Sequence, residues 1–428
     1  MKRRVGEDLW AVLAGLCRRM AAVLAGGAGL ALLLIPVGMA AVSEGGEWPQ
    51  WRGPDRNGIS PETGWLARWP QSGPERLWKA EIGYGYSSVA VAGGRVYAMG
   101  NDGRRDTVWC LDAATGRVVW RKSYPCRKGG YPGPRATPTV DGKVVYTISR
   151  QAQVFCFDAA TGKVLWSKDL ARELKVRTPT WGFAGSPLVM GKLLVLNVGT
   201  AGAALDRTTG RVVWSTGTGK AGYASPVAFK MDGRETVLIF SARALNCLDV
   251  RTGKLLWSLP WRTSYDINAA DPIVVGNRIF ISNGYGPGSC ALVKVENGKP
   301  SIVWRNKEMK NHFSTCVIYK GYIDGAHGTG HVVLRCLSLD TGEVKWTSPR
   351  LRMASLILAD GKLIVQADAG KLLVVEATPE AYRPIAQATV LRGQCWTMPV
   401  LAGGRIYCRN SGKNTGRGEL VCLDVRRR

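Results

Sequence analysis

The stretch CLDAATGRVVW occupies residues 110–120, and close copies of it recur along the chain. CFDAATGKVLW follows at residues 156–166, ALDRTTGRVVW at 204–214 and CLDVRTGKLLW at 247–257, and four degenerate copies bring the count to eight. Six copies end in a tryptophan, and a further tryptophan, Trp78, stands 42 residues before Trp120. Repeats of roughly 40–50 residues at regular spacing are typical of propeller blades.

Short β-branched and aromatic runs precede each copy, joined by two-residue glycine turns, as in PTVDGKVVY at residues 138–146. This pattern predicts a β-hairpin. Together with the strands on either side of the Thr-Gly turn, each repeat then supplies four strands, which we call A to D in chain order. The sequence therefore predicts an all-β fold, an eight-bladed propeller of four-stranded blades over residues 76–428.

The eighth copy ends at Asp424, in its third strand. The run LWKAEI at residues 77–82 can supply the missing outer strand, which would remove the free sheet edges of an open ring. We therefore predict that the N-terminal strand closes the last blade. Residues 44–75 are expected to form a capping segment ahead of the propeller.

Residues that recur from blade to blade are interpreted as architectural, because a catalytic group is usually needed once. The outer-strand tryptophans are expected to pack against the neighbouring blade, and the aspartates to hydrogen-bond the turn backbone. This set comprises Trp78, Trp120, Trp166, Trp214, Trp257, Trp304, Trp346, Asp112, Asp158, Asp206, Asp249 and Asp424.

Five of the eleven cysteines share one repeat-equivalent position, so they belong to different blades and lie too far apart to form disulfides. We expect them to be buried small hydrophobic residues. A disulfide between Cys408 and Cys422, on neighbouring strands of the last blade, is left open. The five are Cys110, Cys156, Cys247, Cys336 and Cys422.

The N-terminus predicts export to the periplasm or cell envelope. Basic residues within 2–19 precede an uncharged stretch at 20–43, the pattern of a signal peptide. The same stretch is long enough to span a bilayer, so membrane attachment through residues 20–42 is the alternative. Residues 1–43 are therefore expected to be a signal peptide or an N-terminal membrane anchor.

The composition is strongly basic, with 58 Lys+Arg against 32 Asp+Glu and a formal net charge of +26. These charges are scattered through the turns and accompany no nucleic-acid motif, so we expect no specific nucleic-acid partner. Affinity for acidic envelope polymers or lipid head groups is the better physical interpretation. The three histidines, His312, His327 and His331, have no cysteine or acidic partner nearby in the sequence, and no metal site is predicted.

The two faces of the predicted propeller differ. The A–B and C–D turns on one face are minimal, whereas the B–C and D–A loops on the other are long and rich in aromatic and arginine side chains. Function concentrates on loops that a rigid scaffold holds, so we expect the binding site on the second face. An ungapped comparison of the blades places one residue of each at the channel mouth: Tyr86, Arg135, Ala184, Tyr223, Ala269, Ser314, Ala354 and Trp396.

The large side chains at this mouth would either stack on a planar ligand or a sugar, or plug the channel. No catalytic residue is predicted. The candidate residues for binding a ligand or partner are Tyr86, Arg135, Trp181, Tyr223, His312 and Trp396.

The repeats resemble those of the pyrroloquinoline-quinone (PQQ)-like propeller superfamily, which includes quinoprotein alcohol dehydrogenases and the outer-membrane assembly lipoprotein BamB. The opening WPQWRGPDRNGIS at residues 48–60 is similar to the leader of exported propellers of planctomycete-type bacteria. The resemblance implies the propeller fold and leaves the function open, because one propeller fold serves many functions.

This chain departs from both the dehydrogenases and the BamB-type protein at residues that matter for their functions. The dehydrogenases have an adjacent-cysteine disulfide ring over the quinone, and this chain has no Cys-Cys pair. Their calcium-binding and catalytic residues find no motif match, and Asp266, Asn268 and Asp271 form the only acid–amide cluster in the loops of the binding face. The BamB-type protein is lipid-anchored at its N-terminal cysteine, whereas Leu16, directly before Cys17, stands where a lipid-attachment site would require a small residue.

We therefore predict an exported, non-catalytic, monomeric propeller without a cofactor, which binds a protein or a cell-envelope polymer. The alternative is a PQQ-dependent alcohol or sugar dehydrogenase, which would hold PQQ with Ca²⁺.

Overall fold

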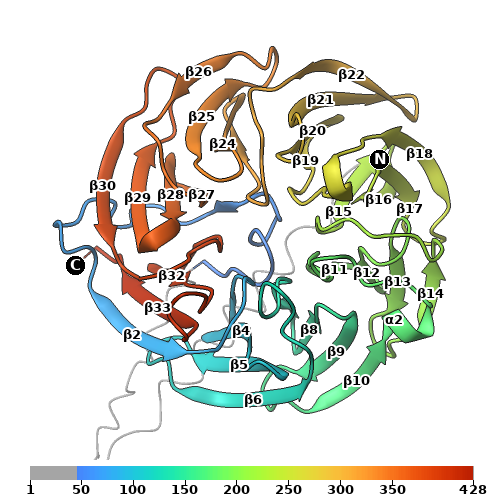
Figure 1. The fold of residues 1–428 in the computed structure, drawn as a ribbon, viewed down its shortest axis with the longest axis horizontal. Helices are drawn as coiled ribbons and strands as arrows, with labels where there is room; N and C mark the ends of the chain where they lie inside the picture. The colour runs from blue at the N-terminus through green and yellow to red at the C-terminus, as the bar shows by residue number, and fades with distance from the viewer. Residues whose placement is uncertain (1–45, 428) are drawn as a thin grey trace, which may run out of the picture. The chain divides into compact units, whose positions relative to one another are not determined.

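The computed structural model describes residues 46–427, and in these residues eight four-stranded antiparallel blades form a ring (Figure 1). This confirms the predicted all-β propeller. The predictions on residues 1–43 lie outside the described residues.

Each blade starts with its innermost strand at the channel and proceeds outward. Blade 1 contains β3 (Ala90–Ala92), β4 (Arg95–Asn101), β5 (Arg105–Asp112) and β6 (Val118–Pro125). Blade 2 contains β7 (Thr139–Asp141), β8 (Val144–Ile148), β9 (Gln153–Asp158) and β10 (Val164–Asp169). Blade 3 contains β11 (Leu188–Met190), β12 (Leu193–Leu196), β13 (Ala203–Asp206) and β14 (Val212–Ser215). Blade 4 contains β15 (Val227–Met231), β16 (Arg234–Phe240), β17 (Ala244–Asp249) and β18 (Leu255–Pro260).

Blade 5 contains β19 (Ile273–Val275), β20 (Arg278–Asn283), β21 (Ser289–Glu296) and β22 (Lys299–Asn306). Blade 6 contains β23 (Val317–Tyr319), β24 (Tyr322–His327), β25 (Val333–Ser338) and β26 (Val344–Thr347). Blade 7 contains β27 (Ala354–Ala359), β28 (Lys362–Ala367), β29 (Lys371–Glu376) and β30 (Pro384–Thr389), and β1 (Ile59–Ser60) joins it along β27. Blade 8 contains β31 (Val400–Ala402), β32 (Arg405–Arg409), β33 (Glu419–Asp424) and β2 (Arg76–Glu81). Short helical turns are α2 (Leu170–Glu173), η1 (Ser264–Asp266) and η2 (Asp368–Gly370).

Blade 8 joins the two ends of the described chain. The N-terminal strand β2 pairs antiparallel with β33, and Trp78 lies opposite Cys422 in the ladder. The predicted closure by the N-terminal strand is therefore confirmed. Arg409 of β32 adds to it, because its buried guanidinium donates to the carbonyls of Ser87 and Met99 in blade 1 and its connection.

The repeated tryptophans pack seven of the eight blades against the next one, and blade 7 has no such tryptophan. The Trp120 indole Nε1 donates to the Ala159 carbonyl of blade 2 at 2.9 Å, and Trp214 Nε1 donates to the Val250 carbonyl of blade 4 at 2.8 Å. Corresponding bonds of the other blades run from Trp78 to Ala113, Trp166 to Arg207, Trp304 to Leu339 and Trp346 to Thr378. The Trp257 ring is also buried, but its Nε1 has no partner and the turn glycine of blade 5, Gly298, does not lie against it.

The glycine of each Thr-Gly turn lies against the tryptophan ring of the preceding blade. Gly210 has φ +72°, and a Cβ built there would stand 2.6 Å from the Trp166 ring. Glycine is therefore required at this position both by the backbone conformation and by the space available. Asp206 completes the turn, since its Oδ1 accepts the backbone N–H and the hydroxyl of Thr209.

Asp112, Asp158 and Asp249 cap their turns as Asp206 does. Asp424 differs, because its carboxylate accepts from the backbone and guanidinium of Arg426 instead of a Thr-Gly turn.

All ten described cysteines are buried free thiols. Cys408 and Cys422 lie on adjacent strands, but their ladder partners are Val421 and Tyr407 respectively. Because successive residues of a strand point to opposite faces, these two side chains project from opposite sides of the blade. The register itself thus explains why the pair is not joined.

Residues 48–60 run into the middle of the ring (Figure 1). Trp48 forms a β-bridge with Val91, and β1 pairs in parallel with β27. This leader segment contacts an inner strand, or the residues directly before one, in every blade. Its eight partners, in blade order, are Val91, Val140, Pro187, Pro226, Asp271, Cys316, Leu358 and Leu401.

Candidate functional site

A cavity of about 220 Å³ lies at the channel mouth. Most of its lining residues belong to the D–A connections between blades, so it opens on the face that the sequence predicted for binding. The lining comprises Trp51, Tyr86, Tyr131, Arg135, Trp181, Ala184, Ser186, Tyr223, Ser225, Ile267, Ala269, Asp271, Tyr285, His312, Phe313, Ser355, Trp396, Thr397 and Met398.

The structure brings all six candidate residues, from Tyr86 to Trp396, together around this one cavity. The ungapped comparison is wrong in two blades, where Phe313 and Ser355 line the cavity in place of Ser314 and Ala354. Both blades lack the proline that precedes strand A in blades 2, 3, 4, 5 and 8. Blade 1 has Val89 at that position, but its predicted residue Tyr86 still lines the cavity. In blade 7 the inner strand already begins at Ala354, which buries that residue in the sheet.

An aromatic wall forms one side of the cavity. The Trp396 ring lies 5.9 Å from both Tyr86 and Tyr131 and 5.3 Å from Phe313, measured between ring centroids. Trp181 meets Tyr131 edge-on at 5.3 Å. The rings are inclined to one another, at 82° for this last pair, so they form a cup and not a flat slot.

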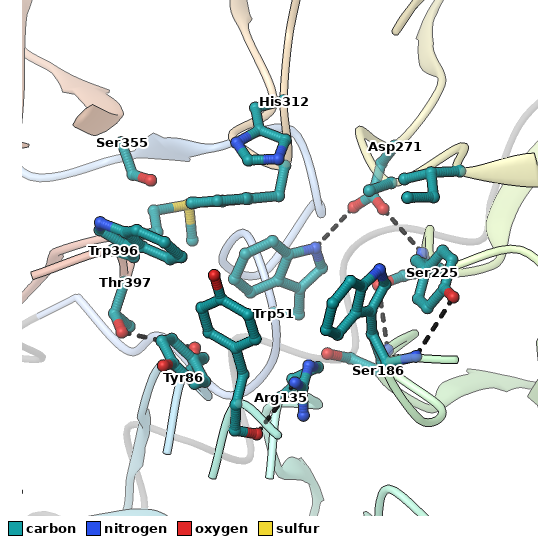
Figure 2. A pocket seen from close by; sticks show the side chains of 18 of the residues that line it. Trp51, Tyr86, Arg135, Ser186, Ser225, Asp271, His312, Ser355, Trp396 and Thr397 are labelled. Carbon is teal, nitrogen blue, oxygen red and sulfur yellow. Dashed lines mark hydrogen bonds between the residues drawn. The ribbon is translucent and has the colours of Figure 1, made fainter. Parts of the chain in front are cut away.

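The leader segment supplies Trp51 to the lining. Its indole Nε1 donates to one carboxylate oxygen of Asp271, and the other oxygen accepts the backbone N–H of Ser225 at 2.7 Å (Figure 2). Sequence reasoning missed Trp51, because it lies outside the repeats and nothing local relates it to the blades. The only available signal was an additional tryptophan in a segment without blade periodicity.

Arg135 is the cationic side chain of the lining. Its guanidinium donates to the carbonyls of Gly133 and Tyr131 and lies 5.5 Å from the centroid of the Tyr86 ring. Burial lowers its pKa to about 10, so it remains charged at neutral pH. Its hydrogen-bond partners are neutral carbonyls, which leaves its charge uncompensated at close range.

Asp271 is the acidic side chain of the lining, and two arginines of the leader segment compensate its negative charge. Burial raises the pKa of Asp271, while the charges of Arg52 and Arg56 in the leader act in the opposite direction. Arg52 is buried and Arg56 is half-buried, and desolvation lowers the pKa of both, to about 10 for Arg56. Two cations therefore accompany this one carboxylate, and the cavity region as a whole is cationic.

His312 and Tyr285 form a hydrogen-bonded pair at the edge of the cavity, with ring centroids 4.7 Å apart. Burial lowers the pKa of His312 to about 4, so the imidazole is neutral near pH 7. The other two histidines lie elsewhere: His327 contacts the Glu308 carbonyl, and His331 is exposed.

The acid–amide cluster suggested by the sequence is not assembled. Asp266 forms ion pairs with Arg243 and Lys220, whereas buried Asn268 donates to backbone carbonyls, including that of Ser241. Within residues 46–427, no group of three or more His, Cys, Asp or Glu side chains is placed to hold a metal ion. In the same range, no helix combines the length and apolar character of a membrane span.

Comparison with known proteins identifies relatives of the fold. The quinohemoprotein alcohol dehydrogenase from Comamonas testosteroni is 13% identical over 89% of this chain and 80% of its own, with a TM-score of 0.70. BamB from Moraxella catarrhalis is 16% identical over 82% of this chain and 100% of its own, with a TM-score of 0.60. A europium-containing methanol dehydrogenase is 12% identical over 89% of this chain and 98% of its own, with a TM-score of 0.53. At these identities the likeness concerns the fold alone.

A comparison with curated proteins gave no match. The family model described as outer membrane protein assembly factor BamB matches residues 62–147 and 127–348, which is more than half of the sequence. Together with the repeats, the eight blades and the solved relatives, this match shows that the chain belongs to the PQQ-like β-propeller family.

Proposed function

We propose that the protein is an exported, non-catalytic, monomeric propeller that binds a protein or cell-envelope component through the cavity at its channel mouth. One observation supports this above others. The residues that recur from blade to blade pack the blades together, whereas residues that differ between blades gather around one cavity. A cavity lined by aromatic side chains and a few polar groups is the usual form of a binding site.

The alternative, a PQQ-dependent alcohol or sugar dehydrogenase, is favoured by the likeness to the Comamonas testosteroni enzyme. A bound Ca²⁺ prefers six to eight oxygen ligands, with carboxylates prominent among them. Asp271 alone supplies a carboxylate to this lining, and both of its oxygens already accept hydrogen bonds. The donor set therefore does not fit a calcium–quinone site, which supports the non-catalytic proposal.

A paired substitution tests the binding face. Replacing Arg135 and Trp396 by alanine should abolish capture of the partner from an envelope extract separated into protein, polysaccharide and lipid fractions. The matched control replaces Lys143 and Lys163 by alanine, two exposed residues in the turns of blade 2 on the opposite face. Capture that survives the first pair of substitutions and is lost with the second would contradict the proposed face.

Two further measurements address catalysis and export. The purified protein, equilibrated with PQQ and Ca²⁺, should not reduce a dye acceptor with alcohols or sugars as substrate. Dye reduction that is lost in the Arg135/Trp396 variant would favour the dehydrogenase. Fusion of residues 1–43 to a reporter enzyme that is active only outside the cytoplasm should give activity, and an inactive, stable fusion would contradict export.

A further inference from the structure

We propose that the cavity binds an acidic sugar, a single hexuronate ring, with the ring face against the aromatic wall and the carboxylate on Arg135. This inference rests on the proposed binding function and specifies the ligand class of the same site. Its basis is the combination of size, ring arrangement, hydroxyl groups and charge at the channel mouth.

The size of the cavity points to one ring. Sites for drug-sized ligands occupy about 300–1,000 Å³, and this cavity has about 220 Å³. A ligand larger than one ring would therefore extend out of the mouth. The lining accommodates one sugar unit, either free or as part of a longer chain.

The arrangement of the rings distinguishes a sugar from a flat aromatic ligand. A flat ring is best held between parallel faces. Here Trp396 lies 28° from Tyr131 and packs against it directly, which leaves no slot between the two, and Trp181 stands nearly perpendicular to Tyr131 at 82°. Such a cup fits a puckered pyranose, whose C–H groups point in several directions and contact aromatic faces. Aromatic side chains bury large areas while their polar ends remain free to hydrogen-bond.

Hydroxyl groups line the same space. Ser186 Oγ and Ser225 Oγ each accept one backbone N–H, from Thr137 and Ser186 respectively, and retain their own O–H groups for donation. Ser186 and Ser225 lie side by side in Figure 2. Tyr223 is arranged in the same way, because its hydroxyl accepts the N–H of Trp181. A row of hydroxyl donors beside apolar rings matches the alternating hydroxyl and C–H surface of a sugar.

The charge of the cavity selects an anionic sugar. Arg135 donates to carbonyls alone, and Lys413 lies 4.2 Å from the centroid of the Tyr131 ring. Asp271 does not compensate these two cations, because its charge is already balanced by Arg52 and Arg56. Its two carboxylate oxygens also accept hydrogen bonds from Trp51 and Ser225. Arginine binds carboxylates through paired, charge-assisted hydrogen bonds, so a ring that bears a carboxylate fits better than a neutral one.

The test compares galacturonate with galactose, which differ at the C6 carboxylate, by isothermal titration of the full chain. We expect galacturonate to bind at least tenfold more tightly than galactose. Arg135→Gln should remove this preference while galactose binding is kept, and Trp396→Ala should weaken both sugars. Unchanged melting temperatures would show that these variants are folded, and the Lys143/Lys163 alanine pair serves as the control that binds like wild type.

Trigalacturonate distinguishes the source of the sugar. Tighter binding of the trimer than of the monomer supports a polymer as ligand, and equal binding supports a free sugar or a chain end. Equal affinity for galactose and galacturonate, no binding of either, or tighter binding of benzoate than of galacturonate would each overturn the acidic-sugar inference.

Failure of this inference is distinguishable from failure of the proposed function. If no uronate binds but an envelope component is still captured in a manner that depends on Arg135 and Trp396, the binding function stands and the ligand class is wrong. If neither is observed, both are overturned.

Discussion

The outer ring of tryptophans and the inner ring of residues at the channel mouth belong to the same blades but differ in their sequence pattern. The outer ring repeats one residue type, whereas the inner ring varies from blade to blade. Most outer positions repeat one device, an indole that covers a glycine turn and donates to a carbonyl of the next blade. The inner positions differ between most blades, and several of them hold half-buried groups that are costly to desolvate, such as Arg135 and His312. Uniformity therefore marks the residues that stabilise the ring, and variation marks those available for recognition.

Removal of the ring closure should have the largest effect. A chain that lacks residues 1–83 loses β2 and the leader segment, which exposes the edge of β33 and the channel. Because a domain is stable by only about 5–15 kcal/mol, we expect this truncation to aggregate or remain unfolded. Calorimetry and size-exclusion chromatography would measure it, with deletion of residues 1–43 as the control. A truncated monomer that melts at the full-length temperature would refute the closure.

Substitution of two glycines in blade 3 distinguishes the cost of backbone strain from the cost of a clash with the tryptophan ring. Gly191 and Gly210 both have positive φ, but a Cβ at Gly191 meets nothing within 4 Å, whereas at Gly210 it meets the Trp166 ring. We expect Gly191→Ala to cost about 1 kcal/mol and Gly210→Ala about 3 kcal/mol. Chemical denaturation measures both values. Equal losses would mean that the ring contact contributes nothing.

The pH dependence of the free energy of unfolding tests the cost of desolvating His312 in the inner ring. The pKa of His312 is lowered to about 4 in the folded protein, below its ordinary value of 6.5. The unfolded chain therefore binds the proton more readily, so the contribution of His312 to stability is complete well above pH 6.5 and falls by about 3 kcal/mol as the pH decreases to 4. Asp106 and Asp324 act in the opposite direction, because burial raises their pKa values to about 6 and 7, so the effect of His312 is measured against its own variant. His312→Asn should reduce this fall, and the exposed His331→Asn should not. Thermal melts at pH 7 and pH 4 provide the measurement, and identical pH profiles for the His312 variant and wild type would exclude the effect.

The smallest effect concerns a single hydrogen bond in the outer ring. Trp214 Nε1 donates to the Val250 carbonyl, whereas Trp257 Nε1 is buried without a partner. Phenylalanine at either position keeps a buried aromatic ring, but only Trp214→Phe loses a hydrogen bond, which contributes about 1 kcal/mol. Denaturation midpoints of the two variants should differ by that amount. A greater loss at Trp257 would contradict this comparison.

The fold was largely predictable because its determinants are local and repeated. The Asp-x-x-Thr-Gly turn, the tryptophan after it and the hairpin glycines each specify a short stretch of backbone, and eight repetitions make the pattern unambiguous. The closing strand was predictable for the same reason, since Trp78 belongs to the repeat spacing. Where a blade departs from the pattern, as at Ser314 and Ala354, the count along the sequence no longer gives the position in space.

The site was predictable in part. The six candidate residues were found because the loops of one face differ from blade to blade. Trp51 and the arrangement around Asp271 were not found, because they depend on a leader segment whose partners lie up to hundreds of residues away in sequence. Long-range contacts without periodicity leave no pattern that one sequence reveals.

The path of the leader through the ring constrains how the chain folds during synthesis. Residues 48–60 and β2 are synthesised before the blades, yet their partners include Leu401 and the strand that ends at Asp424. Early blades can form their hairpins as they appear, but the segment that fills the channel and the strand that seals the ring must wait for the last blade. Native contacts of such great sequence separation form slowly and leave partly folded chains with exposed edges. The final assembly of this propeller therefore has to follow the synthesis of its last blade.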